Sequence, residues 1–312
     1  MLLKYTMCSP EGHQETRTQT KGTTEMETRP SSNAAEDSSF ETEIHPTTVR
    51  TAWIINRPSS REEIEVAIDI IKEEFDSDCP PPSQYLLVKC IPSKLFKALL
   101  KDEETPKGVR VLILGHKQEI LYRIIPGDWY QFIVPRFNKW LDYTLEAMGL
   151  SSVTCDFTFG GATRQTNGMY RKEPDSSFFL GNPSATGGPV VWPSLVLEAG
   201  ISESLPQLRA DAQWWYANSG NRTKIVVLIS TQSNLSDVVI EIWTEIANQS
   251  DHMTRGRQSH VLGCTQTARY TNGVGTGLPL DIPFEDLMRR PKRNQEEEDP
   301  QLTLEWVKWL CD

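Results

Sequence analysis

The chain has 312 residues, a formal net charge of −10, a pI near 5.2 and 38% hydrophobic residues, which fits one large globular domain or two smaller ones. Lys4 interrupts the apolar start, and no run of 18 apolar residues follows, so we expect an intracellular protein, cytoplasmic or nuclear, that is neither secreted nor bound to a membrane. The six cysteines show no paired spacing, which argues against a zinc site and a disulfide framework.

The acidic balance argues against a broad nucleic-acid-binding face, because such faces usually carry net positive charge. One basic cluster at 289–293 directly precedes an acidic run at 296–299. A nuclear-import signal and a phosphate contact are two interpretations of this cluster. A solvated surface loop is the interpretation that we favour.

The N-terminal part of the chain divides into two regions. Residues 1–50 are rich in Thr, Ser, Glu and Gln and almost free of aliphatic side chains, so we expect a disordered tail. Residues 51–128 are expected to form an accessory layer. Its predicted elements, read from apolar spacing and turn residues, are a helix from Ser59 to Phe75, a strand at 85–88, a helix at 93–100 and a hairpin of 109–114 with 121–125.

The expected core domain spans 129–290. A helical crossover connects parallel strands, so the apolar runs on either side of the helix at 204–218 are predicted to be parallel neighbours. A charged linker and a short helix make up the remainder at 291–312. The predicted core elements are a helix at 129–148, strands at 153–159, 169–180 and 195–199, the helix at 204–218, and strands at 224–230, 238–246 and 260–270.

Two acids stand out within these core strands. Asp175 follows Pro174, and Glu198 ends the continuous apolar run of the strand at 195–199. An acid on a buried strand is costly unless something compensates its charge, and carboxylates from neighbouring strands can share a magnesium ion. We therefore predict a metal site at these two acids. Two structural alternatives stay open: Asp175 as a turn acid, and Glu198 in a buried ion pair with Arg209.

The order of these features resembles the restriction-endonuclease-like superfamily, with its signature of Pro-Asp followed by (Asp/Glu)-x-Lys. The segment WPSLVLEAGISESLPQLRADAQWWYANSG is similar to a group of fungal proteins of that superfamily, and the Pro-Asp hairpin with its Glu-tipped strand is similar to bacterial Uma-type endonuclease-like proteins. The resemblance covers about residues 130–285. It implies an α/β fold with a mixed central β-sheet flanked by helices, and hydrolysis of nucleic-acid phosphodiesters with Mg²⁺ or Mn²⁺.

Carried onto this sequence, the resemblance makes Asp175 and Glu198 the metal-binding acids, with the carbonyl of Ala199 as a third oxygen ligand. The signature lysine falls on Gly200, which has no side chain to orient water or stabilise charge. Such a departure implies either a substitute cation or a degenerate site.

The predicted substitute for the lysine is Arg209 on the following helix, with Gln213 as a weaker candidate. Lys172 is expected on the opposite strand face from Asp175, because side chains alternate along a strand. Two hypotheses remain. One is a magnesium-dependent nuclease that uses Asp175, Glu198 and Arg209 on nucleic acid; the other is a non-catalytic binding or scaffold protein that keeps the fold.

Overall fold

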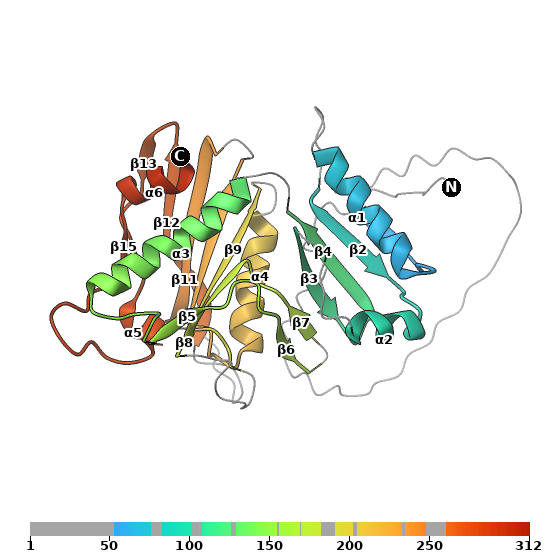
Figure 1. Ribbon diagram of the computed structural model, residues 1–312, viewed down its shortest axis with the longest axis horizontal. Helices are drawn as coiled ribbons and strands as arrows, with labels where there is room; N and C mark the ends of the chain where they lie inside the picture. The colour runs from blue at the N-terminus through green and yellow to red at the C-terminus, as the bar shows by residue number, and fades with distance from the viewer. Residues whose placement is uncertain are drawn as a thin grey trace, which may run out of the picture.

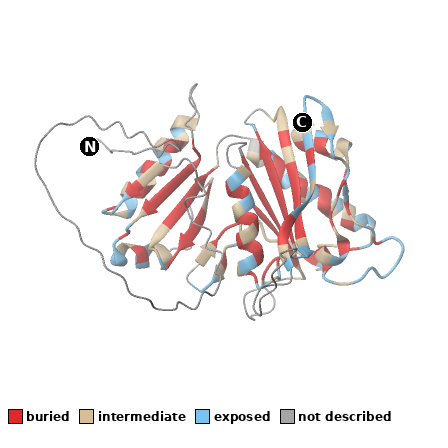
Figure 2. Ribbon diagram, turned by 180° about the vertical axis from the view of Figure 1, so that it is seen from behind, coloured by how far each residue is buried: buried red, intermediate tan, exposed pale blue. Residues whose placement is uncertain are grey.

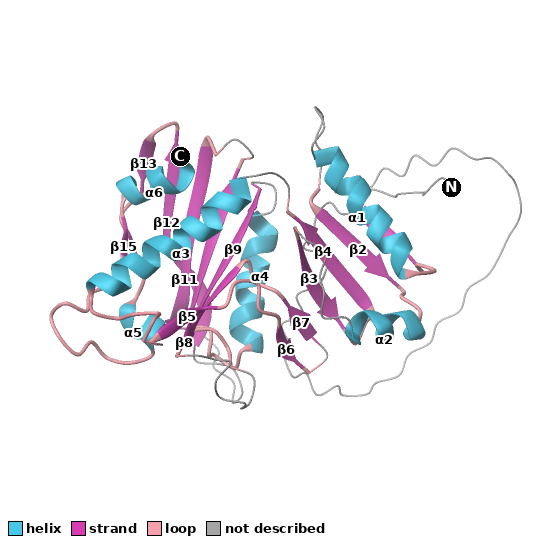
Figure 3. Cartoon of the chain, in the orientation of Figure 1, coloured by secondary structure: helices cyan, strands magenta, loops and turns pink. Residues whose placement is uncertain are grey.

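Two large β-sheets and the helices around them make up most of the described chain (Figure 1, Figure 3). No helix in this part of the chain combines the length and apolar character needed to cross a bilayer. The tail predicted at 1–50 lies outside the described residues. The computed structural model describes residues 53–75, 83–101, 106, 108–125, 129–154, 156–168, 170–181, 191–201, 205–232, 235–247 and 260–312.

The N-terminal sheet has the strand order β1-β2-β4-β3-β7-β6. Strand β1 runs parallel to β2, and all other neighbours in this sheet are antiparallel. Helices α1 (Arg61–Phe75) and α2 (Ser93–Lys101) cover its outer face, where their apolar side chains form one core with the strands. The strands are β1 (Trp53–Asn56), β2 (Tyr85–Lys89), β3 (Val109–Leu114), β4 (Glu119–Ile124), β6 (Gln165–Asn167) and β7 (Tyr170–Lys172).

The C-terminal sheet has the strand order β13-β12-β11-β10-β9-β8-β5. Strands β9 and β10 are parallel, and helix α4 (Leu205–Asn218) is the crossover between them, so this prediction is confirmed. Strand β10 is buried along its whole length, as a central strand requires. The strands are β5 (Phe157–Phe159), β8 (Ser176–Leu180), β9 (Leu195–Ile201), β10 (Ile225–Thr231), β11 (Asp237–Ala247), β12 (His260–Thr271) and β13 (Val274–Thr276).

Helix α4 lies between the two sheets (Figure 1). Its buried side chains, including Leu208 and Trp215, share one apolar cluster with Leu112 of the N-terminal sheet and Val226 of the C-terminal sheet. Most residues in the strands of both sheets are buried (Figure 2). This layering brings polar residues from the two sheets within contact distance of each other around α4.

The outer face of the C-terminal sheet is covered by α3 (Trp129–Ala147) and α6 (Leu304–Cys311) (Figure 1). The shorter elements α5 (Phe284–Met288), β14 (Leu280–Asp281) and β15 (Gln301–Leu302) complete this part of the chain. The predicted α/β fold with mixed β-structure flanked by helices is confirmed, but its strands form two large mixed sheets where one central sheet was predicted.

One predicted strand is divided between the two sheets. The sequence pattern predicts a single strand over 169–180, but β7 pairs with β3 of the N-terminal sheet, and β8 pairs with β9 of the C-terminal sheet. The change falls at Pro174, which has no N–H to continue the ladder. Strands β6 and β7, inside the core region predicted at 129–290, therefore belong to the sheet of the predicted accessory layer. The strand predicted at 153–159 is shorter than expected and starts at Phe157.

The charged segment near the C-terminus is folded and internally paired. Arg290 donates from Nη1 and Nη2 to the carboxylate of Glu297 at 2.7 and 2.6 Å, and Glu297 is buried. Nζ of Lys292 lies 2.8 Å from Oδ1 of Asp299. The basic cluster thus pairs with the acidic run that follows it, as a surface loop whose charges compensate one another.

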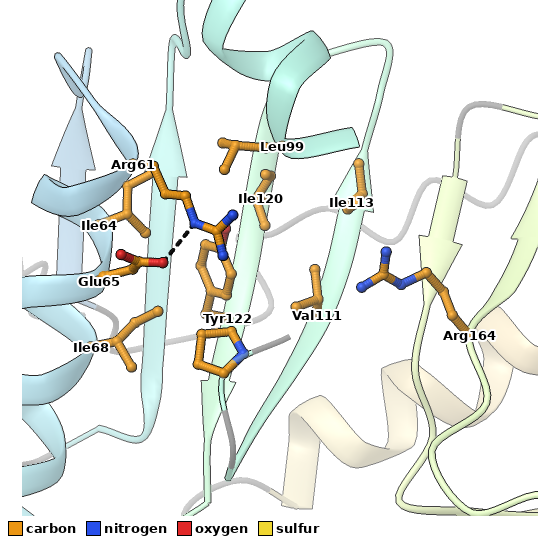
Figure 4. Close-up of a pocket in the computed structure, with 11 residues that line it drawn as sticks. Arg61, Ile64, Glu65, Ile68, Leu99, Val111, Ile113, Ile120, Tyr122 and Arg164 are labelled. Carbon is orange, nitrogen blue, oxygen red and sulfur yellow. Dashed lines mark hydrogen bonds and ion pairs between the residues drawn. The ribbon is translucent and has the colours of Figure 1, made fainter. Parts of the chain in front are cut away.

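A small cavity of about 40 Å³ lies between α1, α2 and the N-terminal sheet (Figure 4). Its walls are mostly apolar, and the ion pair between Arg61 and Glu65 lines one side at 2.6 Å. Arg164 lines the cavity too, and its guanidinium pairs with Glu173 at 2.7 Å. A cavity of this size has room for a water molecule or two, but not for a typical organic ligand.

Candidate functional site

The two predicted acids meet at the junction of β8 and β9. Ser176 of β8 pairs with Leu197 of β9, which places Asp175 next to Glu198 across the pair of strands. The amide of Asp175 donates to the carbonyl of Leu197 at 3.2 Å, and the amide of Ala199 donates to Oδ2 of Asp175 at 2.6 Å. Glu198 is fully buried and Asp175 is 3% exposed. The acids are therefore close together and removed from water.

A cation from the other sheet lies between these acids. Nη2 of Arg123, on β4, donates to Oδ1 of Asp175 at 2.6 Å and to Oε2 of Glu198 at 2.8 Å. Arg123 is itself buried, with 5% of its surface exposed. The predicted accessory layer thus contributes the main cationic partner of both acids. The sequence signal for this contact is the one arginine among the apolar and aromatic side chains at 120–124 of β4.

A second cation, Lys172, also reaches the acids. Its Nζ lies 3.6 Å from Oε1 of Glu198 and 2.5 Å from Oδ1 of Asp211 on α4. The expectation that Lys172 points away from the acids is wrong, because it assumed unbroken alternation through Pro174. Asp211 was not among the predicted site residues. Its side chain also accepts a hydrogen bond from Nε2 of Gln207 at 3.0 Å.

The remaining carboxylate oxygens have protein partners as well. Nε1 of Trp215, on α4, donates to Oε1 of Glu198 at 2.6 Å. Nε of Arg110, on β3, lies 3.3 Å from Oδ1 of Asp175. With the contacts of Arg123 and the Ala199 amide, all four oxygens of the acid pair Asp175 and Glu198 are engaged.

Arg209, the predicted substitute for the signature lysine, lies elsewhere. Its guanidinium donates to both carboxylate oxygens of Glu241 on β11, from Nη2 at 2.5 Å and from Nε at 3.1 Å. Its side chain is 49% exposed, and within the described chain no ion pair joins it to Asp175 or Glu198. The alternative of a Glu198–Arg209 pair is therefore wrong. Gln213, the weaker candidate, donates to the carbonyl of Leu262 at 2.7 Å.

The electrostatics of the cluster follow from its burial. Burial raises the pKa of Glu198, and the charges of Arg123 and Lys172 oppose that rise. Burial also acts to lower the pKa of Arg123, but the surrounding carboxylates, Asp175 and Glu198 foremost, outweigh it and hold this pKa well above its ordinary value. Arg123 therefore stays charged beside the acids at any physiological pH.

Three carboxylates and three cationic side chains balance one another in this buried network. The acids are Asp175, Glu198 and Asp211, and the cations are Arg110, Arg123 and Lys172. A buried ion network is tolerated when its charges are paired and hydrogen-bonded in this way. The network therefore leaves no net negative charge to attract a further cation.

The predicted magnesium site does not fit this arrangement. A magnesium ion needs oxygen ligands at about 2.0–2.1 Å in an octahedral shell, whereas the guanidinium of Arg123 takes the position between the two carboxylates. Within the described residues, no group of three His, Cys, Asp or Glu side chains is placed to hold a metal ion. The adjoining cavity, lined by Arg123, Lys172 and Asp211 among others, measures about 20 Å³ and has room for one water.

Comparisons with known proteins add little to what the geometry of the site indicates about function. The sequence matches no protein-family model and no curated protein. Among solved structures, the chain is similar to a crystal structure from Anabaena variabilis ATCC 29413, described as "a putative nuclease belonging to DUF820", with 13% sequence identity and a TM-score of 0.41. The similarity covers 69% of this chain and 98% of that chain. The description applies to the Anabaena protein, so the chemistry of this chain has to follow from its own residues.

Proposed function

We propose that this protein is a non-catalytic binding or scaffold protein that keeps a nuclease-like fold and no longer cleaves nucleic acid. The observation that supports the proposal is the pair of hydrogen bonds from Nη2 of Arg123 to Asp175 and Glu198. In this arrangement the acids join the N-terminal sheet to the C-terminal sheet. Their role is to compensate a buried arginine rather than to bind a metal ion.

The physical argument rests on what phosphodiester hydrolysis requires. A metal-dependent hydrolase keeps open coordination positions, where water and a phosphate oxygen can bind. Glu198 is fully buried, and the oxygens of both acids already accept hydrogen bonds from protein donors. Gly200 in the position of the signature lysine removes a further group that such chemistry uses.

A second candidate function is the magnesium-dependent nuclease of the sequence resemblance. The observation that favours it is Lys172, whose ammonium group lies 3.6 Å from Oε1 of Glu198 and would supply the positive charge of the missing lysine. In this version Asp175, Glu198 and the carbonyl of Ala199 would hold Mg²⁺ or Mn²⁺, and nucleic acid would be the substrate. It requires Arg123 to leave the acid pair first.

A cleavage assay separates the two candidates. Full-length protein is incubated with supercoiled plasmid, single-stranded DNA and RNA in Mg²⁺ or Mn²⁺, and compared with Asp175→Asn. A surface substitution, Asp237→Asn, is the matched control, since Asp237 pairs with Arg269 at the protein surface. We expect none of the three proteins to cleave any of these substrates. Cleavage by the wild type and by Asp237→Asn that falls at least 100-fold in Asp175→Asn would overturn the binding proposal in favour of the nuclease.

A further inference from the structure

Arg123 occupies the position that a metal ion would take between two acids. One atom, Nη2, contacts a carboxylate oxygen of Asp175 and one of Glu198. A bridging cation makes contacts of this kind, although the hydrogen-bond lengths of 2.6 and 2.8 Å exceed metal–oxygen bonds. The guanidinium thereby supplies positive charge to two carboxylates that are buried away from water.

The arginine comes from outside the sheet that carries the acids. Arg123 lies on β4 of the N-terminal sheet, 52 residues before Asp175 and 75 before Glu198. The contact therefore forms only when the two sheets close around α4. The N-terminal sheet acts as a cover over the acid pair.

The other two nitrogens of the guanidinium have fewer polar contacts than Nη2. Within the described chain, Nε and Nη1 of Arg123 are buried without a hydrogen-bond acceptor, and Nη1 lies 4.0 Å from Oδ2 of Asp211. The small cavity lined by Arg123, Lys172 and Asp211 adjoins this group. Truncation of the side chain at Cβ would enlarge that cavity beside the two carboxylates.

We infer that Arg123 is a built-in substitute for a metal ion, and that its contact with Asp175 and Glu198 keeps divalent cations out of the acid pair. This inference rests on the proposed function, since it explains why the wild-type protein would not use the acids for metal-dependent cleavage. Removal of the Arg123 side chain leaves three acids and two cations in the network, a net charge of −1. It also opens a space between the two carboxylates. A divalent cation then has both charge and room in its favour.

The test is metal binding by the full-length chain without Arg123. Binding of Mn²⁺ is measured by titration calorimetry and by electron paramagnetic resonance at pH 7.5, for the wild type, Arg123→Ala and the double variant Arg123→Ala/Glu198→Gln. Arg269→Ala is the matched control, because it removes an arginine from a single surface carboxylate, Asp237. We expect one saturable Mn²⁺ site in Arg123→Ala alone, with affinity at least tenfold above that of the other proteins.

The thermal midpoint gives a second readout. At Mn²⁺ concentrations near 100 times the dissociation constant, the midpoint of Arg123→Ala should rise by about 5 °C. If that variant is unfolded without metal, Mn²⁺ should restore its far-ultraviolet circular dichroism. A folded variant without a Mn²⁺ site, or an unfolded variant that Mn²⁺ does not restore, overturns the inference.

The two proposals fail in different ways. Wild-type cleavage that depends on Asp175 overturns the proposed function, whatever Arg123→Ala binds. Absence of Mn²⁺ binding by Arg123→Ala, together with an inactive wild type, overturns only the inference that Arg123 replaces a metal ion.

Discussion

Nη2 of Arg123 lies 2.8 Å from Oε2 of Glu198, although 75 residues separate the two in sequence and they belong to different sheets. A buried charge that loses its partner is strongly destabilising. Each sheet therefore depends on the other for the compensation of its buried charge. Substitutions at this contact report on the stability of both halves of the chain.

Loss of the arginine side chain should destabilise the protein strongly. We expect Arg123→Met to lower the free energy of unfolding at pH 7 by about 3–5 kcal/mol, because it leaves the acids uncompensated. Arg269→Met is the control, since Arg269 pairs with Asp237 at the surface with 59% of its side chain exposed, and it should cost less than about 1 kcal/mol. Urea unfolding measures both. Equal losses in the two variants would contradict the assignment.

Neutralising an acid should offset part of that loss. In the double variant Arg123→Met/Glu198→Gln, the amide oxygen can still accept the hydrogen bond of Trp215, and one unpaired buried charge is gone. We expect the double variant to be more stable than the sum of the single variants predicts, with a coupling of about 0.5–3 kcal/mol. The measurement is a double-mutant cycle in urea. Strictly additive losses would show that Arg123 and Glu198 do not interact.

The indole of Trp215 should contribute through its hydrogen bond as well as its packing. Trp215→Phe removes the donor that reaches Oε1 of Glu198 at 2.6 Å. Trp214→Phe is a matched control on the same helix, since Nε1 of Trp214 is buried without a hydrogen-bond partner in the described chain. We expect the loss at Trp215 to exceed that at Trp214 by about 1.5–3 kcal/mol, the usual range for a hydrogen bond to a charged group. Thermal unfolding followed by circular dichroism measures the stability of both variants. Equal losses of stability would show that the hydrogen bond from Trp215 to Glu198 does not stabilise the protein.

Acid should weaken the paired loop near the C-terminus. The hydrogen bonds from Arg290 lower the pKa of Glu297 from its ordinary value of 4.5 to about 2. A carboxyl with a lowered pKa stabilises the folded state above pH 4.5 and loses that contribution as the pH falls toward 2. Glu297→Gln should therefore flatten the pH dependence of the unfolding midpoint over this window. Glu298→Gln, at an exposed neighbour, should leave the profile unchanged, and identical profiles for the two variants would contradict the prediction.

Element positions follow from local patterns in the sequence. The apolar spacing from Ile64 to Ile71 determines α1, and the continuous run that ends at Glu198 determines β9. The parallel pairing of β9 with β10 follows from the helix between them. The meeting of Asp175 with Glu198 is also foreseeable, because both lie on consecutive strand patterns of one sheet.

The cationic partners of Asp175 and Glu198 could not be predicted from local sequence patterns. The interpretation of Lys172 failed because Pro174 moves the chain from one sheet to the other, and alternation holds only within an unbroken strand. Arg209 lies on α4, as predicted, but its guanidinium pairs with Glu241 of β11 and not with Glu198. Helical spacing alone does not decide between two neighbouring carboxylates.

The sequence by itself determined the helices except the short α5, most of the strands, and the two acids, one directly before β8 and one on β9, since spacing, turn residues and chain breakers act over a few neighbouring residues. Only the tertiary structure decided which cation compensates the acids. That choice depends on the packing of the N-terminal sheet against α4, which places Arg123 beside residues far along the chain. Because burial makes an unpaired charge so costly, this long-range contact determines the chemistry of the acid pair.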